Sequence, residues 1–104
     1  NYNRLGRRRI DATYSASYDA PTAVVKTALQ EAVDRFPQLL GDPKPEIYLS
    51  QYGDSAITYL VRAWVDSKDY WPTFYGLQEA VRETFAAHGV EMTYNHLNVH
   101  MIKD

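Results

Sequence analysis

Hydrophobic and polar residues alternate most clearly in the middle of the chain, over residues 47–52 and 55–65. This period of two is typical of half-buried strands. Gly53 and Asp54 lie between the two segments and predict a two-residue hairpin turn, because glycine accepts a positive φ without steric cost. Further on, large apolar residues recur at helical spacing and predict one apolar stripe: Trp71, Phe74, Leu77, Val81 and Phe85. We therefore expect a hairpin and a helix that bury their apolar faces against each other.

The helix after this hairpin has recognisable start and stop signals. Asp69 is suited to the N-cap position and Pro72 to the first turn, where a missing N–H costs nothing. Gly89 follows His88 and is suited to a left-handed cap at the C-terminal end. Gly76, in the middle of the helix, costs about 1 kcal/mol relative to alanine. A close approach of another backbone segment would explain it.

The first part of the chain predicts a further strand and a further helix. Residues 10–18 alternate in the same way as the hairpin strands. Asp19 or Ala20 is expected at the cap position of the helix, with Pro21 in its first turn. The helix then carries an apolar stripe: Val25, Leu29, Ala32, Val33 and Phe36. A stretch rich in proline and glycine, residues 37–45, ends it and forms a stiff loop.

Two short strands are expected after the second helix, over residues 90–94 and 97–102. The order of elements is then β-α-β-β-α-β with one strand more. This order predicts an α+β fold, a ferredoxin-like βαββαβ two-layer sandwich with an extra C-terminal strand and both helices on one face of an antiparallel sheet. The extra strand either adds to a sheet edge or pairs with a neighbouring molecule.

Composition indicates a single globular domain and excludes several classes of function. The 104 residues are 45% hydrophobic and 23% charged, and a domain of this size buries roughly 65% of its unfolded surface. The net charge of -2 argues against a nucleic-acid partner. The third strand also lacks the aromatic and basic signature of RNA-recognition domains with a related fold. No cysteine is present for disulfide or thiolate chemistry, and no apolar run is long enough to cross a bilayer.

Motifs for catalysis, cofactor binding and metal binding are missing from the sequence. It has neither a nucleophile elbow nor a phosphate-binding loop. His96 and His100 are four residues apart, but in a strand this spacing is about 13 Å, too far for both to hold one ion. We therefore expect a protein that is not an enzyme and that needs no cofactor or metal. A small enzyme that uses His96 or His100 as a base is kept as an alternative.

Arginines cluster near the start of the chain, at positions 7, 8 and 9. Arg7, Arg8 and Arg9 are interpreted either as part of a solvated linker or strand end, or as a positive rim that faces anions or lipid headgroups.

Aromatic residues favour the sheet face that points away from the predicted helices. The residues expected on this face are Tyr48, Tyr52, Leu60 and Trp64. Exposed apolar area of this kind marks an interface, unless a terminal segment folds over it.

Several short segments together resemble a known family. They are GDSAITYLVRAWV, the DYW before the second helix, FAAHGVEM at the end of that helix and NVH near the C-terminus. The asparagine-tyrosine start, the arginine cluster and SYDAP add to the likeness, which spans nearly the whole chain. In these segments and their order the chain resembles the C-terminal cytoplasmic domain of the small-conductance mechanosensitive channel (MscS) family.

This resemblance implies a part of a larger channel. The membrane helices and a middle β domain would precede the chain, and the parent protein would be a homo-heptamer in the cell (inner) membrane, with this domain in the cytoplasm. In the family, seven copies build a vestibule with side portals. The resemblance further implies three segments: residues 1–9 as a linker or the end of the preceding β domain, 10–95 as the ferredoxin-like domain, and 96–104 as a barrel-type strand.

The resemblance also implies roles for the candidate residues. The terminal strands of the subunits would form a parallel barrel, lined or covered by Leu97, Asn98, Val99, His100 and Met101. The aromatic sheet face would be a subunit contact, and the arginine cluster would lie near the junction with the middle domain. The alternative is a ferredoxin-like regulatory or small-molecule-binding module that associates through the same sheet face.

Overall fold

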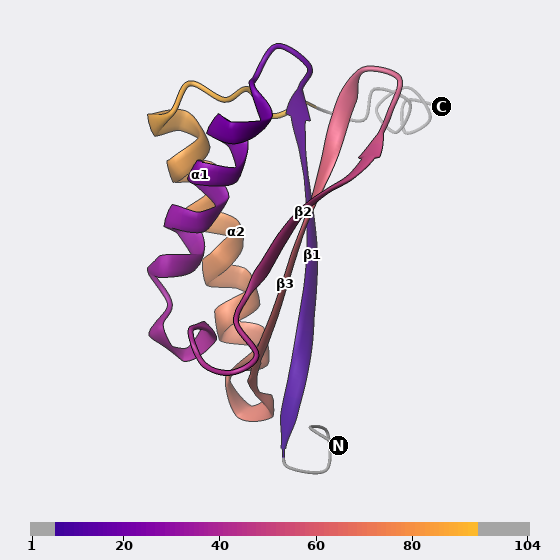
Figure 1. The fold of residues 1–104 in the computed structure, drawn as a ribbon. Coiled ribbons are helices and arrows are strands. Elements are labelled where there is room, and N and C mark those ends of the chain that lie inside the picture. Colours follow the sequence, from indigo (N-terminus) through magenta and orange to yellow (C-terminus); the bar gives the residue numbers. More distant parts are fainter. Residues whose placement is uncertain (1–5, 94–104) are drawn as a thin grey trace, which may run out of the picture.

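The computed structural model describes residues 6–93 and shows two helices packed on one face of a three-stranded antiparallel sheet (Figure 1). The strands are β1 (Arg7–Ser17), β2 (Glu46–Tyr52) and β3 (Ala56–Asp66), and the helices are α1 (Thr22–Asp34) and α2 (Tyr70–Ala87). Strand β3 lies in the centre, between β1 and β2. The predicted α+β architecture, with an antiparallel sheet and both helices on one side, is confirmed for this part of the chain.

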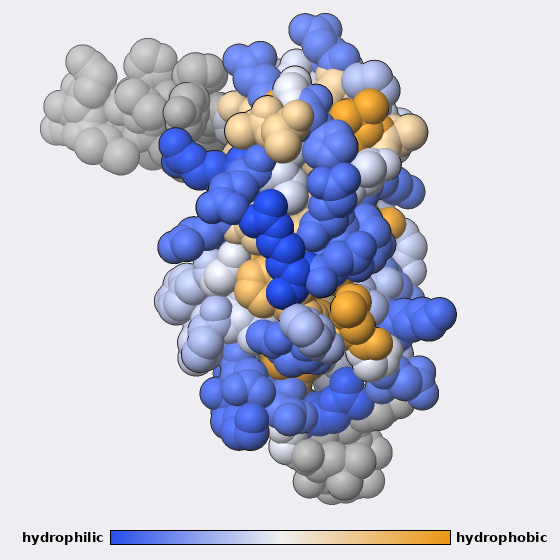
Figure 2. Space-filling model, turned by 90° about the vertical axis from the view of Figure 1, so that its left-hand side faces the viewer, coloured by the Kyte–Doolittle hydropathy of each residue, from blue (hydrophilic) through white to orange (hydrophobic). Residues whose placement is uncertain are grey.

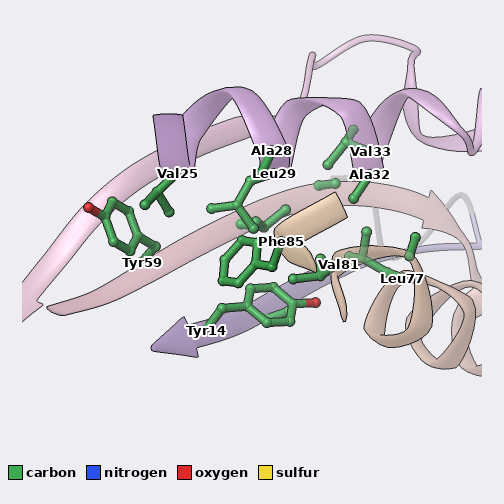
Figure 3. Close-up of a cluster of buried hydrophobic side chains, with 14 of the residues drawn as sticks. Tyr14, Val25, Ala28, Leu29, Ala32, Val33, Tyr59, Leu77, Val81 and Phe85 are labelled. Carbon is green, nitrogen blue, oxygen red and sulfur yellow. The ribbon is translucent and has the colours of Figure 1, made fainter. Parts of the chain in front are cut away.

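The hydrophobic core lies between the sheet and the helices (Figure 3). Alternate residues of β1 and β3 are buried, in the order predicted from the sequence: Ile10, Ala12, Tyr14 and Ala16, then Ile57, Tyr59, Val61, Ala63 and Val65. The helices contribute Val25, Leu29 and Val33 from α1, with Leu77, Val81 and Phe85 from α2. Trp71 departs from the predicted stripe, because half of its side chain is exposed.

The C-terminal end of α2 has the expected glycine cap. Gly89 has a φ of +70°. The Val90 N–H donates to the Phe85 carbonyl at 2.8 Å and the Gly89 N–H to the Ala86 carbonyl at 3.2 Å. These two bonds and the buried pair of Val90 and Phe85 form a Schellman motif. The prediction made for Gly89 is therefore confirmed.

The N-terminal ends of both helices differ from expectation. Pro21 occupies the N-cap position of α1 and no side chain caps the helix, so the assignment of Asp19 or Ala20 as cap was wrong. Asp69 is the N-cap residue of α2 but makes no side-chain cap. Its carboxylate accepts instead from the Lys68 ammonium at 3.0 Å.

The hairpin between β2 and β3 is longer than two residues, because β2 ends at Tyr52 and β3 begins at Ala56. The Gly53 N–H donates to the Ala56 carbonyl at 2.8 Å. Gly53 does not have a positive φ, so the expected reason for this glycine was wrong. A Cβ on Gly53 would lie only 3.0 Å from the Ala56 carbonyl oxygen, and this close approach is what favours glycine.

A β-bulge interrupts β2. Leu49 lies opposite Tyr59 and Gln51 lies opposite Thr58, so Ser50 is the extra residue. The register after the bulge places Tyr52 opposite Ile57, whose side chain points toward the helices. Tyr52 therefore lies on the helix side of the sheet, and its expected place beside Tyr48 was wrong.

The two ends of the described chain also differ from the sequence-based expectation. Strand β1 begins at Arg7, three residues before the predicted start. Residues 90–93 form no strand, although the Ser17 N–H donates to the Glu91 carbonyl at 2.9 Å. This bond places the segment beside the outer edge of β1. The strand predicted over 97–102 lies outside the described residues.

Candidate interaction surfaces

The outer surface of the helix layer is largely hydrophilic (Figure 2). Two polar contacts connect the helices on this side: Arg35 Nη1 forms an ion pair with Glu83 Oε1 at 2.6 Å, and His88 Nε2 lies 3.0 Å from Glu31 Oε1. Because these groups are solvated and paired within the chain, this part of the helix layer offers little apolar area for a partner, whereas the start of α2 exposes Trp71 and Tyr75.

The opposite side of the sheet, here called the open face, is covered by neither helix (Figure 1). It comprises the alternate residues that point away from the core, among them Arg9 and Asp11 of β1, Glu46 and Tyr48 of β2, and Leu60, Arg62 and Trp64 of β3. Of the interface residues predicted on this face, Tyr48 and Trp64 are present, whereas Tyr52 is not.

An ionic ladder crosses the open face. Asp11 accepts from Arg9 Nε at 3.0 Å through one carboxylate oxygen and from Arg62 Nε at 2.9 Å through the other. On the far side, Arg62 lies opposite Glu46 in the register of β2 and β3. The hydrogen bond to Asp11 raises the pKa of Arg62 above its ordinary value. The open face is therefore partly ionic, in addition to the aromatic and apolar residues that the sequence predicted there.

Apolar side chains flank this ladder. Tyr48 is 45% exposed and lies opposite Leu60, which is half-buried. Trp64 is also half-buried and lies opposite Arg9. Mixed polar and apolar composition of this kind is typical of interfaces between protein subunits.

The three clustered arginines do not act as one group. Arg7 Nη1 donates to the Asp42 carbonyl at 3.0 Å, and Arg9 pairs with Asp11 on the open face. Arg8, on the helix side, lies with its Cζ 3.8 Å from the ring centroid of Tyr70. Successive residues of a strand point to opposite faces, which explains the division. A role as a positive rim stays a prediction.

Sequence reasoning missed a cluster of rings at the start of α2. We define this aromatic cluster as Tyr70, Trp71, Phe74 and Tyr75, whose ring centroids lie 4.8 to 6.2 Å apart in five pairs. Trp71 and Tyr75 are 50% and 59% exposed. The signal was present, since four of six consecutive residues are aromatic, but the helical period assigned two of them to the core.

A groove runs between the end of α2 and the outer edge of β1. Two adjoining cavities of about 410 and 400 Å³ share Arg82, Met92 and Thr93 in their lining. The lining of this groove ends at Thr93. The residues predicted for a terminal barrel strand come later in the sequence and lie outside the described residues: Leu97, Asn98, Val99, His100 and Met101.

Comparison with known proteins identifies the family. Residues 7–92 match the family model for the C-terminal part of the mechanosensitive ion channel MscS. The small-conductance mechanosensitive channel of Edwardsiella ictaluri is 30% identical over 101 residues, which cover 97% of this chain and 35% of that protein. An MscS family protein of Synechocystis is 30% identical over 103 residues, with the same shares. The chain thus spans about a third of the length of these relatives.

Solved structures support the same fold. The closed-state MscS of Helicobacter pylori superposes with a TM-score of 0.81 at 20% identity, over 91% of this chain and 38% of that one. Arabidopsis thaliana MSL1 gives a TM-score of 0.71 at 17% identity, over 91% and 36%. Within residues 6–93, neither helix combines the length and hydrophobicity needed to span a membrane. The chain belongs to the MscS family of mechanosensitive ion channels and forms its C-terminal domain.

Proposed function

We propose that this chain is the vestibule domain of a mechanosensitive channel, in which it joins subunits and encloses the approach to the pore. The pore and the tension sensor lie in the remaining part of the parent protein. Support comes from the family match over residues 7–92 and from relatives about three times as long as this chain. The MscS family is one of ion channels and not a class of enzymes.

The observation that carries the proposal is the asymmetry of the two-layer fold. Apart from the aromatic cluster at the start of α2, the helix layer is hydrophilic and paired within the chain, whereas the open face combines an ionic ladder with Tyr48, Leu60 and Trp64. The open face fits a ring of copies if it meets a second, different patch on the neighbouring copy, because a cyclic ring is built from head-to-tail contacts that every copy repeats.

The number of subunits, the location of the parent in the cell membrane and the role of the terminal strand follow from the family resemblance, and they are part of the proposal. The parent is a homo-heptamer of the cell membrane with this domain on the cytoplasmic side. Residues 1–9 lead from a preceding β domain, although Arg7 to Arg9 already form the start of β1; residues 10–95 form the rest of the ferredoxin-like domain, and residues 96–104 supply one strand each to a barrel. A closed barrel would remove the edges that a single strand leaves unpaired.

The test is a deletion of residues 97–104 in the full-length parent. We expect fewer assembled channels, measured as the mass of the purified detergent complex, and fewer stretch-activated events in patch-clamp recordings of giant spheroplasts. The intact parent should have the mass of seven subunits. A deletion mutant with unchanged mass and unchanged conductance would argue against an assembly role for the tail.

A further inference from the structure

The aromatic cluster leaves a stacked pair of rings in solvent. Trp71 and Tyr75 are one helical turn apart, with centroids 5.7 Å apart and planes inclined by 27°. They are among the most exposed large apolar side chains of the described residues, at 50% and 59%. The core does not require them, because Leu77, Val81 and Phe85 already form the buried stripe of α2.

The cluster is held in one arrangement by its neighbours. The rings of Tyr70 and Phe74 are parallel within 3°, and the Arg8 guanidinium lies over Tyr70 with its Cζ 3.8 Å from the ring centroid. Such a cation–π contact and ring packing restrict side-chain rotamers before any partner arrives. A partner therefore meets a surface that loses little further entropy on binding.

The position at which the chain enters the domain indicates the partner. The Ser67 N–H donates to the Gly6 carbonyl at 2.7 Å, and Ser67 precedes Tyr70 by only three residues. Gly6 in turn precedes Arg8, which lies on Tyr70. The polypeptide that comes before Gly6 is therefore attached beside the aromatic cluster. The relatives extend well beyond this domain, since this chain covers 35% of their length.

We propose that the aromatic cluster is the docking site for the polypeptide that precedes residue 1 in the parent protein. This inference rests on the proposed function, in which the chain is the C-terminal part of a channel. The preceding segment would place apolar side chains on Trp71 and Tyr75. Because it is tethered, its effective concentration is on the order of 1 mM, so an intrinsic dissociation constant of about 0.1 mM keeps the site about 90% occupied.

The absence of cysteine from the sequence makes a labelling experiment possible. Tyr75→Cys reports on the cluster, and Lys26→Cys, on the exposed side of α1, is the matched control. Each is made in the 104-residue chain and in the full-length parent, in which cysteines outside this domain are replaced by serine. The measured quantity is the rate of modification by a maleimide. For each site, the rate in the parent is divided by the rate in the 104-residue chain.

We expect the rate at position 75 to fall at least about tenfold in the parent, since labelling requires the docked segment to open, while the rate at position 26 stays within about threefold. Adding Trp71→Ala should restore fast labelling at position 75 in the parent and change nothing in the 104-residue chain. Trp71 is half exposed, so this variant should fold, as circular dichroism would verify.

Three results would overturn the inference. Equal rates at position 75 in both proteins would show that nothing covers the cluster, and in a parent that conducts normally this failure would leave the proposed function intact. Equal slowing at positions 26 and 75 would indicate general crowding of the domain. In the third result, position 75 is labelled slowly in the 104-residue chain, and more slowly as the protein concentration rises. This would show that a second copy of the chain covers the cluster.

Discussion

The ring of Phe36 lies against Gly76 in the middle of α2. A Cβ built on Gly76 would be 2.9 Å from Cε1 and 3.1 Å from Cζ of Phe36. The close approach of the Phe36 side chain thus explains why glycine is favoured at position 76. The sequence predicted a close approach of another backbone segment, and that prediction was wrong. For alanine at position 76, the gain in helix propensity of about 1 kcal/mol is opposed by the cost of moving the Phe36 ring out of the way.

We expect Gly76→Ala to bring no stabilisation in the wild-type background. In a Phe36→Ala background, where the ring is gone, the same change should raise the free energy of unfolding by about 1 kcal/mol. Urea unfolding of the wild type, the two single variants and the double variant measures this difference as a coupling energy. The same effect of Gly76→Ala in both backgrounds would refute the steric explanation.

Gly89 is required by its backbone conformation and not by lack of space. Its φ is +70°, and apart from Gly89 and its two chain neighbours no atom of the described residues lies within 4 Å of the place that a Cβ would take. We expect Gly89→Ala to lower the free energy of unfolding by about 1–2 kcal/mol, the cost of a left-handed conformation for an L-residue. Gly41→Ala is the control, because Gly41 has equal space and no positive φ. Equal effects at the two positions in denaturant titrations would contradict this prediction.

Tyr14 should make stability depend on pH in the alkaline range. Burial raises the pKa of the Tyr14 phenol above its ordinary value, and its hydroxyl donates to Gln78 Oε1 at 2.6 Å. Above about pH 10 the phenol ionises in the unfolded chain while it stays protonated in the folded one. The free energy of unfolding should then fall by up to about 1.4 kcal/mol per pH unit.

Tyr14→Phe separates this effect from the other tyrosines. At pH 7 the variant should be less stable by about 1 kcal/mol, because it loses the hydrogen bond to Gln78. As the pH rises through about 10, the wild type should lose stability faster than the variant, so the difference between them shrinks and then reverses. Unfolding curves at each pH measure it, and parallel pH profiles would be the contrary result.

At the scale of elements, the sequence predicts strands and helices well where the apolar period is regular. Residues 56–66 alternate without interruption, and β3 has the predicted faces. The bulge at Ser50 could not be predicted, because neither Ser50 nor its neighbours carry a local signal and the register depends on pairing with β3. That one extra residue moved Tyr52 to the other side of the sheet.

The aromatic cluster illustrates a second limit. Trp71 and Phe74 fit the helical period of α2, but the buried face of this helix runs through Thr73, Leu77 and Val81, so Trp71 lies at the side of that face and remains half exposed. Periodicity identifies a face and does not tell how wide its covered part is. The pairing of Arg8 with Tyr70 depends on tertiary structure, since the two residues are far apart in sequence.

The ladder between β1 and β3 should contribute modestly to stability. The carboxylate of Asp11 is shared by two arginines, and all three side chains are at least about a third exposed, so solvent screens the attraction. We expect Asp11→Asn to cost less than about 1 kcal/mol in low salt, with the difference shrinking as ionic strength rises. Asp54→Asn in the exposed hairpin is the control for a general charge effect. A cost well above this limit that salt does not alter would indicate a buried role for Asp11.

At the scale of the whole molecule, the open face and the helix layer are expected to respond differently to new charge. Leu60 lies on the open face opposite Tyr48 and is half-buried, whereas Gln30 is exposed on α1. In the 104-residue chain, Leu60→Glu should change the free energy of unfolding by no more than about 1 kcal/mol, because the new carboxylate stays in contact with water and lies near Arg62.

In the full-length parent the same substitution should have a much larger effect, if subunits meet at the open face. A carboxylate buried without a partner at each contact of a ring would cost several kcal/mol for the assembly, since every copy repeats the defect. We expect Leu60→Glu to shift the purified parent from the assembled form toward smaller species in mass measurements, while Gln30→Glu leaves it unchanged. A Leu60→Glu parent that keeps its full mass would place the subunit contact elsewhere, because a surface that tolerates a new charge in every copy remains hydrated in the assembly.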